Sequence, residues 1–182
     1  MPRALPRLAA LALTGAVLGL AACAAPSPAA TPTPTSDAAD APLFATDEEA
    51  LAAAVEAYEA YLAVSDSITA DIDADLARIR EVTTPEFADF SEHDFAAFRD
   101  AGLRTEGSSA VDSARLAEFS PRRVTFYACQ DVSAVKLLNS TNEDVTPSDR
   151  EARIPLVIDA VAVHGDALLI DGNEVWSGDN FC

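Results

Sequence analysis

The chain has few basic side chains, two histidines and three cysteines. Its 12 lysine and arginine residues face 30 aspartate and glutamate residues, which gives a formal net charge of −18 at pH 7. Because a phosphate backbone is bound by a basic surface, this balance excludes nucleic acid as a partner. No Gly-x-Ser-x-Gly, His-Glu-x-x-His or glycine-rich phosphate loop occurs in the sequence. We therefore expect no metal and no cofactor, and no motif identifies a reaction.

Long apolar stretches are also scarce, and the one of note lies near the N-terminus. Arg3 and Arg7 precede residues 8–22, which are apolar apart from Thr14 and two glycines. This run is shorter than the roughly 20 residues that a membrane-spanning helix needs. A basic start, a short apolar run and small residues at its end are typical of a secretory signal peptide. We predict that residues 1–22 are such a peptide and are removed.

The end of this segment, Leu20-Ala21-Ala22-Cys23, resembles the lipobox of bacterial lipoproteins at all four positions. The resemblance implies that the Cys23 thiol is acylated and that the protein is anchored extracytoplasmically to the cell membrane. Each buried methylene contributes about 0.8 kcal/mol, so two or three acyl chains would hold the protein on a bilayer. The expected partner is thus the membrane, to which the protein attaches through its lipid anchor. The alternative is an ordinary secretory peptide in which Cys23 is incidental.

Cys129 and Cys182 remain once Cys23 is acylated, an even number in an exported chain. Such pairs commonly form disulfides outside the cytoplasm. A bridge between them would stabilise the fold by about 4 kcal/mol in the chain-entropy model and would tie the last residue to a strand. We predict this disulfide; the alternative is two unrelated thiols.

Composition divides the rest into a linker and a domain. Residues 23–45 are rich in alanine, proline, serine and threonine and cannot bury a core. Prolines favour extended conformations, so we expect a semi-rigid tether. The folded domain is expected at residues 46–182.

Three helices are expected at the start of this domain, over about 47–65, 71–82 and 85–101. Thr46 and Glu49 form a capping box before the first helix. Thr84 and Pro85 are a cap and a first helical residue for the third, and Gly102 ends it.

Asp94 falls on the side of the third helix that carries four phenylalanines. These are Phe87, Phe90, Phe95 and Phe98. A carboxylate among apolar side chains is a candidate pocket acid. Alternatively, Ser91 and Asp94 form a second capping box at which the helix restarts. His93 points away from the phenylalanines and is expected on the surface.

From residue 103 onward, runs of β-branched and aromatic residues are bounded by turn residues, which predicts strands. The expected strands are 124–132, 152–163 and 167–176, with a weaker edge strand within 106–119. His164-Gly165-Asp166 predicts a hairpin turn that sets the last two antiparallel. Residues 139–151 form a long connection, and 136–138 are a candidate continuation of the 124–132 strand. The expected class is α+β: three N-terminal helices packed on a curved antiparallel sheet of about four strands.

This order of elements resembles the ketosteroid-isomerase-like superfamily, also called nuclear transport factor two-like. The anchor, tether and terminal cysteine are similar to those of small actinobacterial lipoproteins. The superfamily resemblance covers about residues 46–182 and implies a cone formed by sheet and helices. In that superfamily the cone serves isomerases and dehydratases, holds a ligand, or is filled in interaction domains. Fold therefore does not select among these functions.

An enzyme would need a carboxylate aimed into the cone. Asp159, in mid-strand between Val157 and Val161, and Asp131 are candidates beside Asp94. The alternative for both is an outward position on the solvated side of the sheet.

We expect a ligand-binding or protein-interaction accessory domain of the cell envelope, with a small apolar ligand or an envelope protein as partner. The alternatives are a cofactor-independent isomerase or dehydratase that uses a cavity aspartate, and a structural subunit of an envelope complex. An inward aspartate in an open cavity would support the enzyme, and an open dry cavity would support ligand binding. A filled cone with an exposed apolar sheet face would support assembly.

Overall fold

The computed structural model describes residues 43–182, which form an α+β fold with helices first and strands after, as predicted. The helical elements are α1 (Asp47–Ala70), the 3₁₀ helix η1 (Leu76–Glu81) and α2 (Pro85–Asp100). The strands are β1 (Arg104–Glu106), β2 (Ala110–Ser120), β3 (Arg123–Asp131), β4 (Lys136–Leu138), β5 (Arg153–Val161) and β6 (Leu169–Val175).

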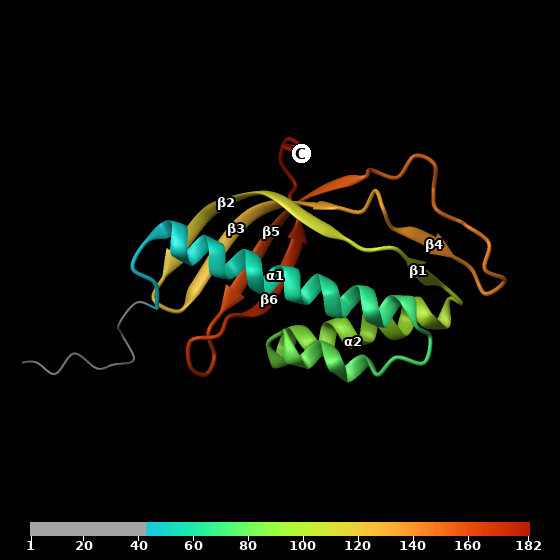
Figure 1. Cartoon of the computed structure of the whole chain (residues 1–182), viewed down its shortest axis with the longest axis horizontal. Helices are drawn as coiled ribbons and strands as arrows, with labels where there is room; N and C mark the ends of the chain where they lie inside the picture. The colour runs from blue at the N-terminus through green and yellow to red at the C-terminus, as the bar shows by residue number, and fades with distance from the viewer. Residues whose placement is uncertain (1–42) are drawn as a thin grey trace, which may run out of the picture. The chain divides into compact units, whose positions relative to one another are not determined.

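The main sheet has four antiparallel strands in the order β2-β3-β5-β6, in agreement with the prediction. Its strands arch over α1, which runs across one face (Figure 1). Register shifts interrupt the β2–β3 and β5–β6 ladders, and such bulges increase the local bend and twist of a sheet. The sheet therefore has an inner face, covered by α1, and an outer face.

Strand periodicity decides which side chains enter the core. Phe126 of β3, Ile158 of β5 and Ile170 of β6 are fully buried, together with Tyr58 of α1. Residues at odd positions of β3 and β5 lie on the outer face, because side chains alternate along a strand. Full burial of one such apolar side chain contributes about 1.5–3 kcal/mol, so these contacts hold α1 on the sheet.

Helix α1 begins where the sequence predicts and ends later. The Thr46 hydroxyl accepts a hydrogen bond from the Glu49 N–H at 3.2 Å, which confirms the cap. The helix continues to Ala70 rather than residue 65 because Ile68 extends its buried side. The Ser67 hydroxyl donates to a carbonyl one turn earlier, which accommodates it within the helix.

The predicted helix at 71–82 is wrong over its first half. The Asp71 carboxylate accepts the Asp73 N–H at 2.9 Å, and the Asp75 carboxylate accepts the Ala77 N–H at 3.0 Å. Such local bonds compete with helical hydrogen bonding. Only the short η1 follows, and it places Ile79 in the core.

Helix α2 confirms the predicted cap and stop. The Thr84 hydroxyl accepts the Phe87 N–H, and Pro85 is the first helical residue. Gly102 follows with φ +72°, and the Leu103 N–H donates to the Phe98 carbonyl, a Schellman ending. The helix is continuous through Ser91, so the predicted restart there is wrong.

The candidate continuation of β3 at residues 136–138 forms a separate sheet instead. Strand β4 pairs antiparallel with β1, beyond the end of the β2–β3 ladder. Gly107, with φ +105°, stands at the junction. A Cβ there would lie 2.0 Å from the Ala134 carbonyl oxygen, so the two backbones approach as only glycine allows. Strands β5 and β6 pair antiparallel as predicted, but residues 162–168 join them in a longer connection than the tight turn expected at Gly165.

We expect Gly107→Ala to destabilise the domain by about 3 kcal/mol, since it combines backbone strain with a clash. Gly165→Ala is the matched control, because its φ is also positive, +72°, but no atom lies within 4 Å of the added Cβ. We expect this control to cost about 1 kcal/mol. Urea unfolding followed by circular dichroism measures both; equal losses would show that the close approach to Ala134 does not matter.

Leu43 and Phe44, which the sequence assigns to the tether, belong to the domain. The Leu43 N–H donates to the Pro121 carbonyl at 3.3 Å, and the Phe44 ring lies 6.1 Å from that of Phe119. An apolar pair at this point stabilises the entry of the chain into α1. The predicted signal peptide, Cys23 and the rest of the predicted tether lie outside the described residues.

Candidate functional site

The inner face of the sheet is occupied by a buried polar group within the apolar core. The Tyr58 hydroxyl donates to Gln130 Oε1 at 3.4 Å and accepts from Asn173 Nδ2 at 3.3 Å. Burial raises the pKa of Tyr58 well above its usual range, so the phenol is neutral at physiological pH. Its hydrogen bonds link α1 to β3 and β6 and leave it no free donor.

An aromatic row leads from this centre towards α2. Tyr61 stacks on Tyr58 with ring centroids 5.5 Å apart, Phe87 follows at 5.9 Å, and Phe90 follows Phe87 at 6.2 Å. Phe90 is 60% exposed, so the predicted phenylalanine face is only partly buried. Burial raises the pKa of Tyr61 as well. The buried polar side chains of this region are phenols, amides and hydroxyls; the carboxylate of Asp94, whose charge also raises the pKa of Tyr61, is exposed.

Ser91, the predicted second cap, is buried in this region. It is 4% exposed, and its hydroxyl oxygen has no hydrogen-bond partner within residues 43–182. The predicted capping bond to Asp94 is therefore not formed. Asp94 itself is exposed and takes part in no hydrogen bond or ion pair in the described domain, so it neither caps a helix nor lines a pocket. His93 is exposed, as expected.

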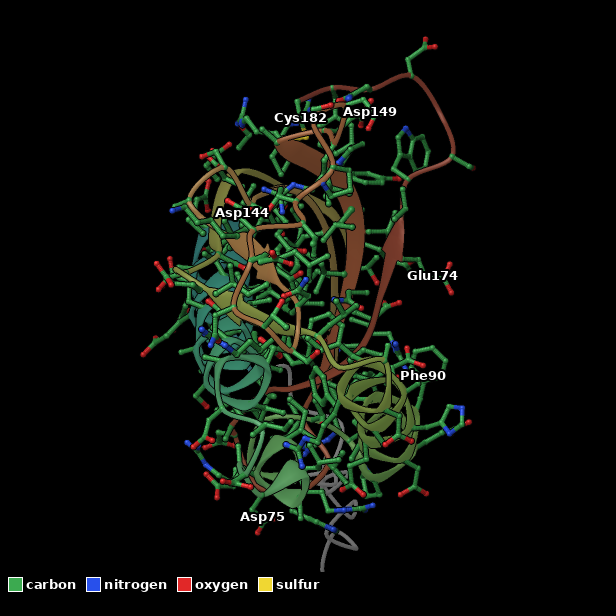
Figure 2. All side chains as sticks on the ribbon, turned by 90° about the vertical axis from the view of Figure 1, so that its right-hand side faces the viewer. Asp75, Phe90, Asp144, Asp149, Glu174 and Cys182 are labelled. Atoms are coloured by element: carbon green, nitrogen blue, oxygen red, sulfur yellow. A yellow bond between two sulfur atoms is a disulfide. The ribbon has the colours of Figure 1, made fainter. Side chains whose placement is uncertain are left out.

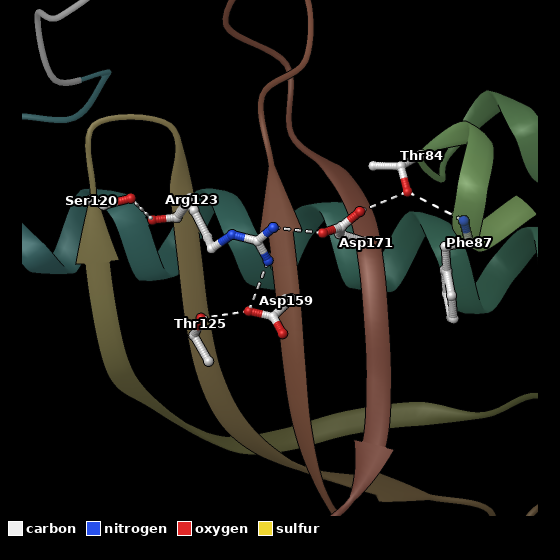
Figure 3. A network of polar contacts seen from close by, with 7 residues as sticks. All are labelled: Thr84, Phe87, Ser120, Arg123, Thr125, Asp159 and Asp171. Atoms are coloured by element: carbon white, nitrogen blue, oxygen red, sulfur yellow. Dashed lines mark hydrogen bonds and ion pairs between the residues drawn. The ribbon is translucent and has the colours of Figure 1, made fainter.

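Asp159 lies on the outer face of the sheet, away from the core (Figure 3). Its carboxylate accepts a hydrogen bond from the Thr125 hydroxyl at 2.5 Å and lies 3.3 Å from the Arg123 guanidinium. The outward alternative is therefore correct for this residue. A carboxylate held by a cation on the outer face of the sheet cannot serve as a base on the inner face.

Arg123 joins this carboxylate to a second one. Its guanidinium also donates to Asp171 at 2.7 Å, and Asp171 accepts the Thr84 hydroxyl at 2.8 Å (Figure 3). Thr84 is the N-cap of α2, so the network ties the start of that helix to β3, β5 and β6. We interpret it as a structural clamp.

Asp131 is also placed away from the core, at the end of β3. Its carboxylate accepts the Ser133 N–H at 2.8 Å, and hydrogen bonds from Ser133 lower the pKa of Asp131. The outward alternative is therefore correct for Asp131 as well as for Asp159, and none of the three candidate aspartates lies on the inner face.

Cys129 and Cys182 form the predicted disulfide, with Cα atoms 5.7 Å apart. Cys129 lies on the outer face and is fully buried beneath the C-terminal segment. Arg153 donates to the Cys182 carbonyl at 2.5 Å, and the Cys182 N–H donates to Asn180 at 2.8 Å. The disulfide to β3 and the hydrogen bond from Arg153 of β5 thus fix the end of the chain on the outer face.

This fixed end builds a group of aromatic rings on the outer face: Tyr127, Trp176 and Phe181, which we call the aromatic cluster. The Tyr127 ring lies edge-on to Trp176 at 5.2 Å and to Phe181 at 6.1 Å. The Arg115 guanidinium carbon lies 5.0 Å from the centre of the Phe181 ring. Together with Leu116 these residues line an open cleft of about 320 Å³.

Gly178 lies against the indole of Trp176 next to this cleft. A Cβ at Gly178 would lie 2.4 Å from the Trp176 indole nitrogen, so the indole rests against the Gly178 backbone. The position of Trp176 is thereby determined by the turn that follows it as well as by Tyr127.

Sequence reasoning missed the aromatic cluster, although signals for it were present. Trp176 is the single tryptophan of the chain and precedes a Ser-Gly turn. Tyr127 lies two residues before Cys129 on the same face of its strand, and Phe181 adjoins Cys182. A disulfide between these cysteines brings Phe181 towards the strand that carries Tyr127, but the packing of the three rings follows from the tertiary structure.

Residues 43–182 contain no group of three or more histidine, cysteine, aspartate or glutamate side chains arranged to hold a metal ion. Within the same range no helix has the length and apolar character to cross a membrane.

Comparisons with known proteins extend the description of the fold. No protein-family profile matches the sequence, and no curated protein is significantly similar to it. Among solved structures, the intermembrane-space region of the chloroplast protein ARC6 is similar in fold, with a TM-score of 0.51 and 12% sequence identity. The match covers 70% of this chain and 97% of that one. At this identity the likeness shows a shared fold and no more.

Proposed function

We propose that the protein is an extracytoplasmic lipoprotein, anchored to the cell membrane through acylated Cys23, whose domain binds another protein of the cell envelope. Residues 1–22 would be the signal peptide, and the residues that follow Cys23 would tether the domain. The domain would belong to the nuclear transport factor two-like class, in the variant whose cone is filled.

The aromatic cluster carries the proposal. Tyrosine, tryptophan and arginine are the residues most enriched among those that dominate protein–protein affinity. Here one of each surrounds an open cleft, and the disulfide, Arg153 and Gly178 hold the cluster in place. A surface fixed in advance loses less conformational entropy on binding.

The inner face supports this choice over the enzyme. The candidate aspartates lie elsewhere, and Tyr58 is enclosed by hydrogen-bond partners and apolar side chains. A cofactor-independent isomerase or dehydratase would need a base at that position. Binding through the outer face needs none.

Site-specific cross-linking in the envelope tests the proposal. Glu174 is exposed on β6 opposite Val157, which itself pairs with Tyr127, so a photoreactive benzoylphenylalanine in place of Glu174 would lie beside the aromatic cluster. Asp75, in a distant exposed turn (Figure 2), is the matched control position. We expect a discrete protein adduct from position 174 and none from position 75.

The adduct must also depend on the cluster itself. Adding Trp176→Ser to the position-174 protein should abolish it, because the indole forms one wall of the cleft. An adduct that survives this change, equal capture at position 75, or no adduct at either position would contradict the proposed function.

A further inference from the structure

Arg115 differs from every other arginine of residues 43–182. The other eight each donate at least one hydrogen bond to an oxygen atom of the domain. Arg115 is exposed on β2 and donates none within this range; its described contact is with the Phe181 ring. What sets Arg115 apart is that its N–H donors have no protein acceptor at all among the described residues.

Arg115 also lies beside the aromatic cluster. Arg115 pairs with Tyr127 in the β2–β3 ladder and lines the same cleft as Trp176 and Phe181. Its planar fork of N–H donors matches a carboxylate, and stacking on an aromatic ring leaves those donors available. The cleft therefore combines rings that can pack on an apolar side chain with a cation that can receive an acidic one.

Nearby acidic groups do not satisfy this cation. Asp112, on the same strand, is paired with Arg153, which the Cys182 carbonyl also holds. No carboxylate of the described residues forms an ion pair with Arg115, so the guanidinium is available to a carboxylate of a partner.

We propose that the cleft binds a segment of the partner protein in which an aromatic residue adjoins an aspartate or glutamate, whose carboxylate Arg115 receives. This inference rests on the proposed function and specifies the chemistry of the partner. The aromatic side chain packs against Tyr127, Trp176 and Phe181, and the acidic neighbour forms a charge-assisted hydrogen bond with the guanidinium.

The test uses two capped tetrapeptides, Gly-Phe-Glu-Gly and its isostere Gly-Phe-Gln-Gly, acetylated and amidated so that the glutamate side chain is the sole carboxylate. Trp176 is the only tryptophan of the chain, so its fluorescence reports on the cleft directly in the full mature protein in detergent micelles. We expect the glutamate peptide to bind about tenfold more tightly, since a hydrogen bond to a charged group contributes about that factor.

Arg115→Gln should remove this tenfold preference and leave the weaker binding of the glutamine peptide unchanged. Arg104→Gln is the matched control, because Arg104 is a partly exposed arginine of β1 bound to Asn142, and the preference should persist. Circular dichroism and the intact disulfide verify that each variant is folded.

Equal affinity of the two peptides for the unmodified protein, or an unchanged preference in Arg115→Gln, would overturn the assignment of the carboxylate to Arg115. So would an absence of any fluorescence response to either peptide. These results leave the cross-link from position 174 intact, whereas failure of the cross-link overturns the proposed function itself. The two hypotheses therefore fail separately.

Discussion

Cys23→Ala is expected to abolish acylation of the protein and, with it, the lipid anchor. Acylation requires the thiol, and no helix of the described domain can replace a lipid as a membrane anchor. With 30 acidic residues in the chain, the domain would be repelled by an anionic bilayer rather than bound to it. The variant should either be released into the medium or remain uncleaved.

Metabolic labelling with a palmitate analogue, followed by separation of membrane and soluble fractions, measures this effect. The unmodified protein should carry the label and sediment with membranes, whereas the variant should carry none. Ala22→Gly, which keeps a small residue before the thiol, is the control and should retain both label and attachment. An unlabelled wild-type protein would refute the lipid anchor.

Loss of the disulfide is expected to have the largest effect on stability. Replacing both Cys129 and Cys182 by alanine should lower the free energy of unfolding by about 4 kcal/mol, since the closed loop then gains conformational freedom in the unfolded chain. The end of the chain would also be released from β3. Because Phe181 adjoins Cys182, the aromatic cluster should lose one of its rings and Trp176 fluorescence should change.

Urea unfolding with and without reductant measures the stability of both proteins. Reductant should weaken the unmodified protein to the level of the double variant and leave the variant unchanged. Alkylation without reductant should find no free thiol among the two cysteines of the domain. Recovery of both cysteines in alkylated form would show that the chain end is held by Arg153 and Asn180 alone.

If the proposed function is correct, the same double variant should lose the cross-link from position 174 while remaining attached to the membrane. Anchoring and docking would then be separate properties of the chain, one supplied by Cys23 and the other by its C-terminus.

Local sequence signals were reliable where neighbouring residues decide the structure. The caps at Thr46 and Thr84 and the stop at Gly102 depend on side chains and backbone groups within one turn of the helix. Runs of β-branched and aromatic residues between turn residues likewise located β3, β5 and β6. The acidic stretch at 71–75 was misread because Asp71 and Asp75 can satisfy either a helix start or a turn, and the sequence does not distinguish the two outcomes.

The sequence by itself thus determined the class of fold, the order of its elements, the pairing of Cys129 with Cys182 and the prediction of a lipid anchor. It could not determine which side of each strand faces α1. In β5, for example, apolar residues occupy both faces: Val157 and Val161 share one face with Asp159, and Ile158 lies on the other. That choice follows from the packing of Phe126, Ile158 and Tyr58, which are far apart in the chain. The aromatic cluster likewise exists only because the disulfide carries Phe181 back to Tyr127 across a separation of 53 residues between the cysteines. Contacts of that range are formed by tertiary structure, and no local pattern encodes them.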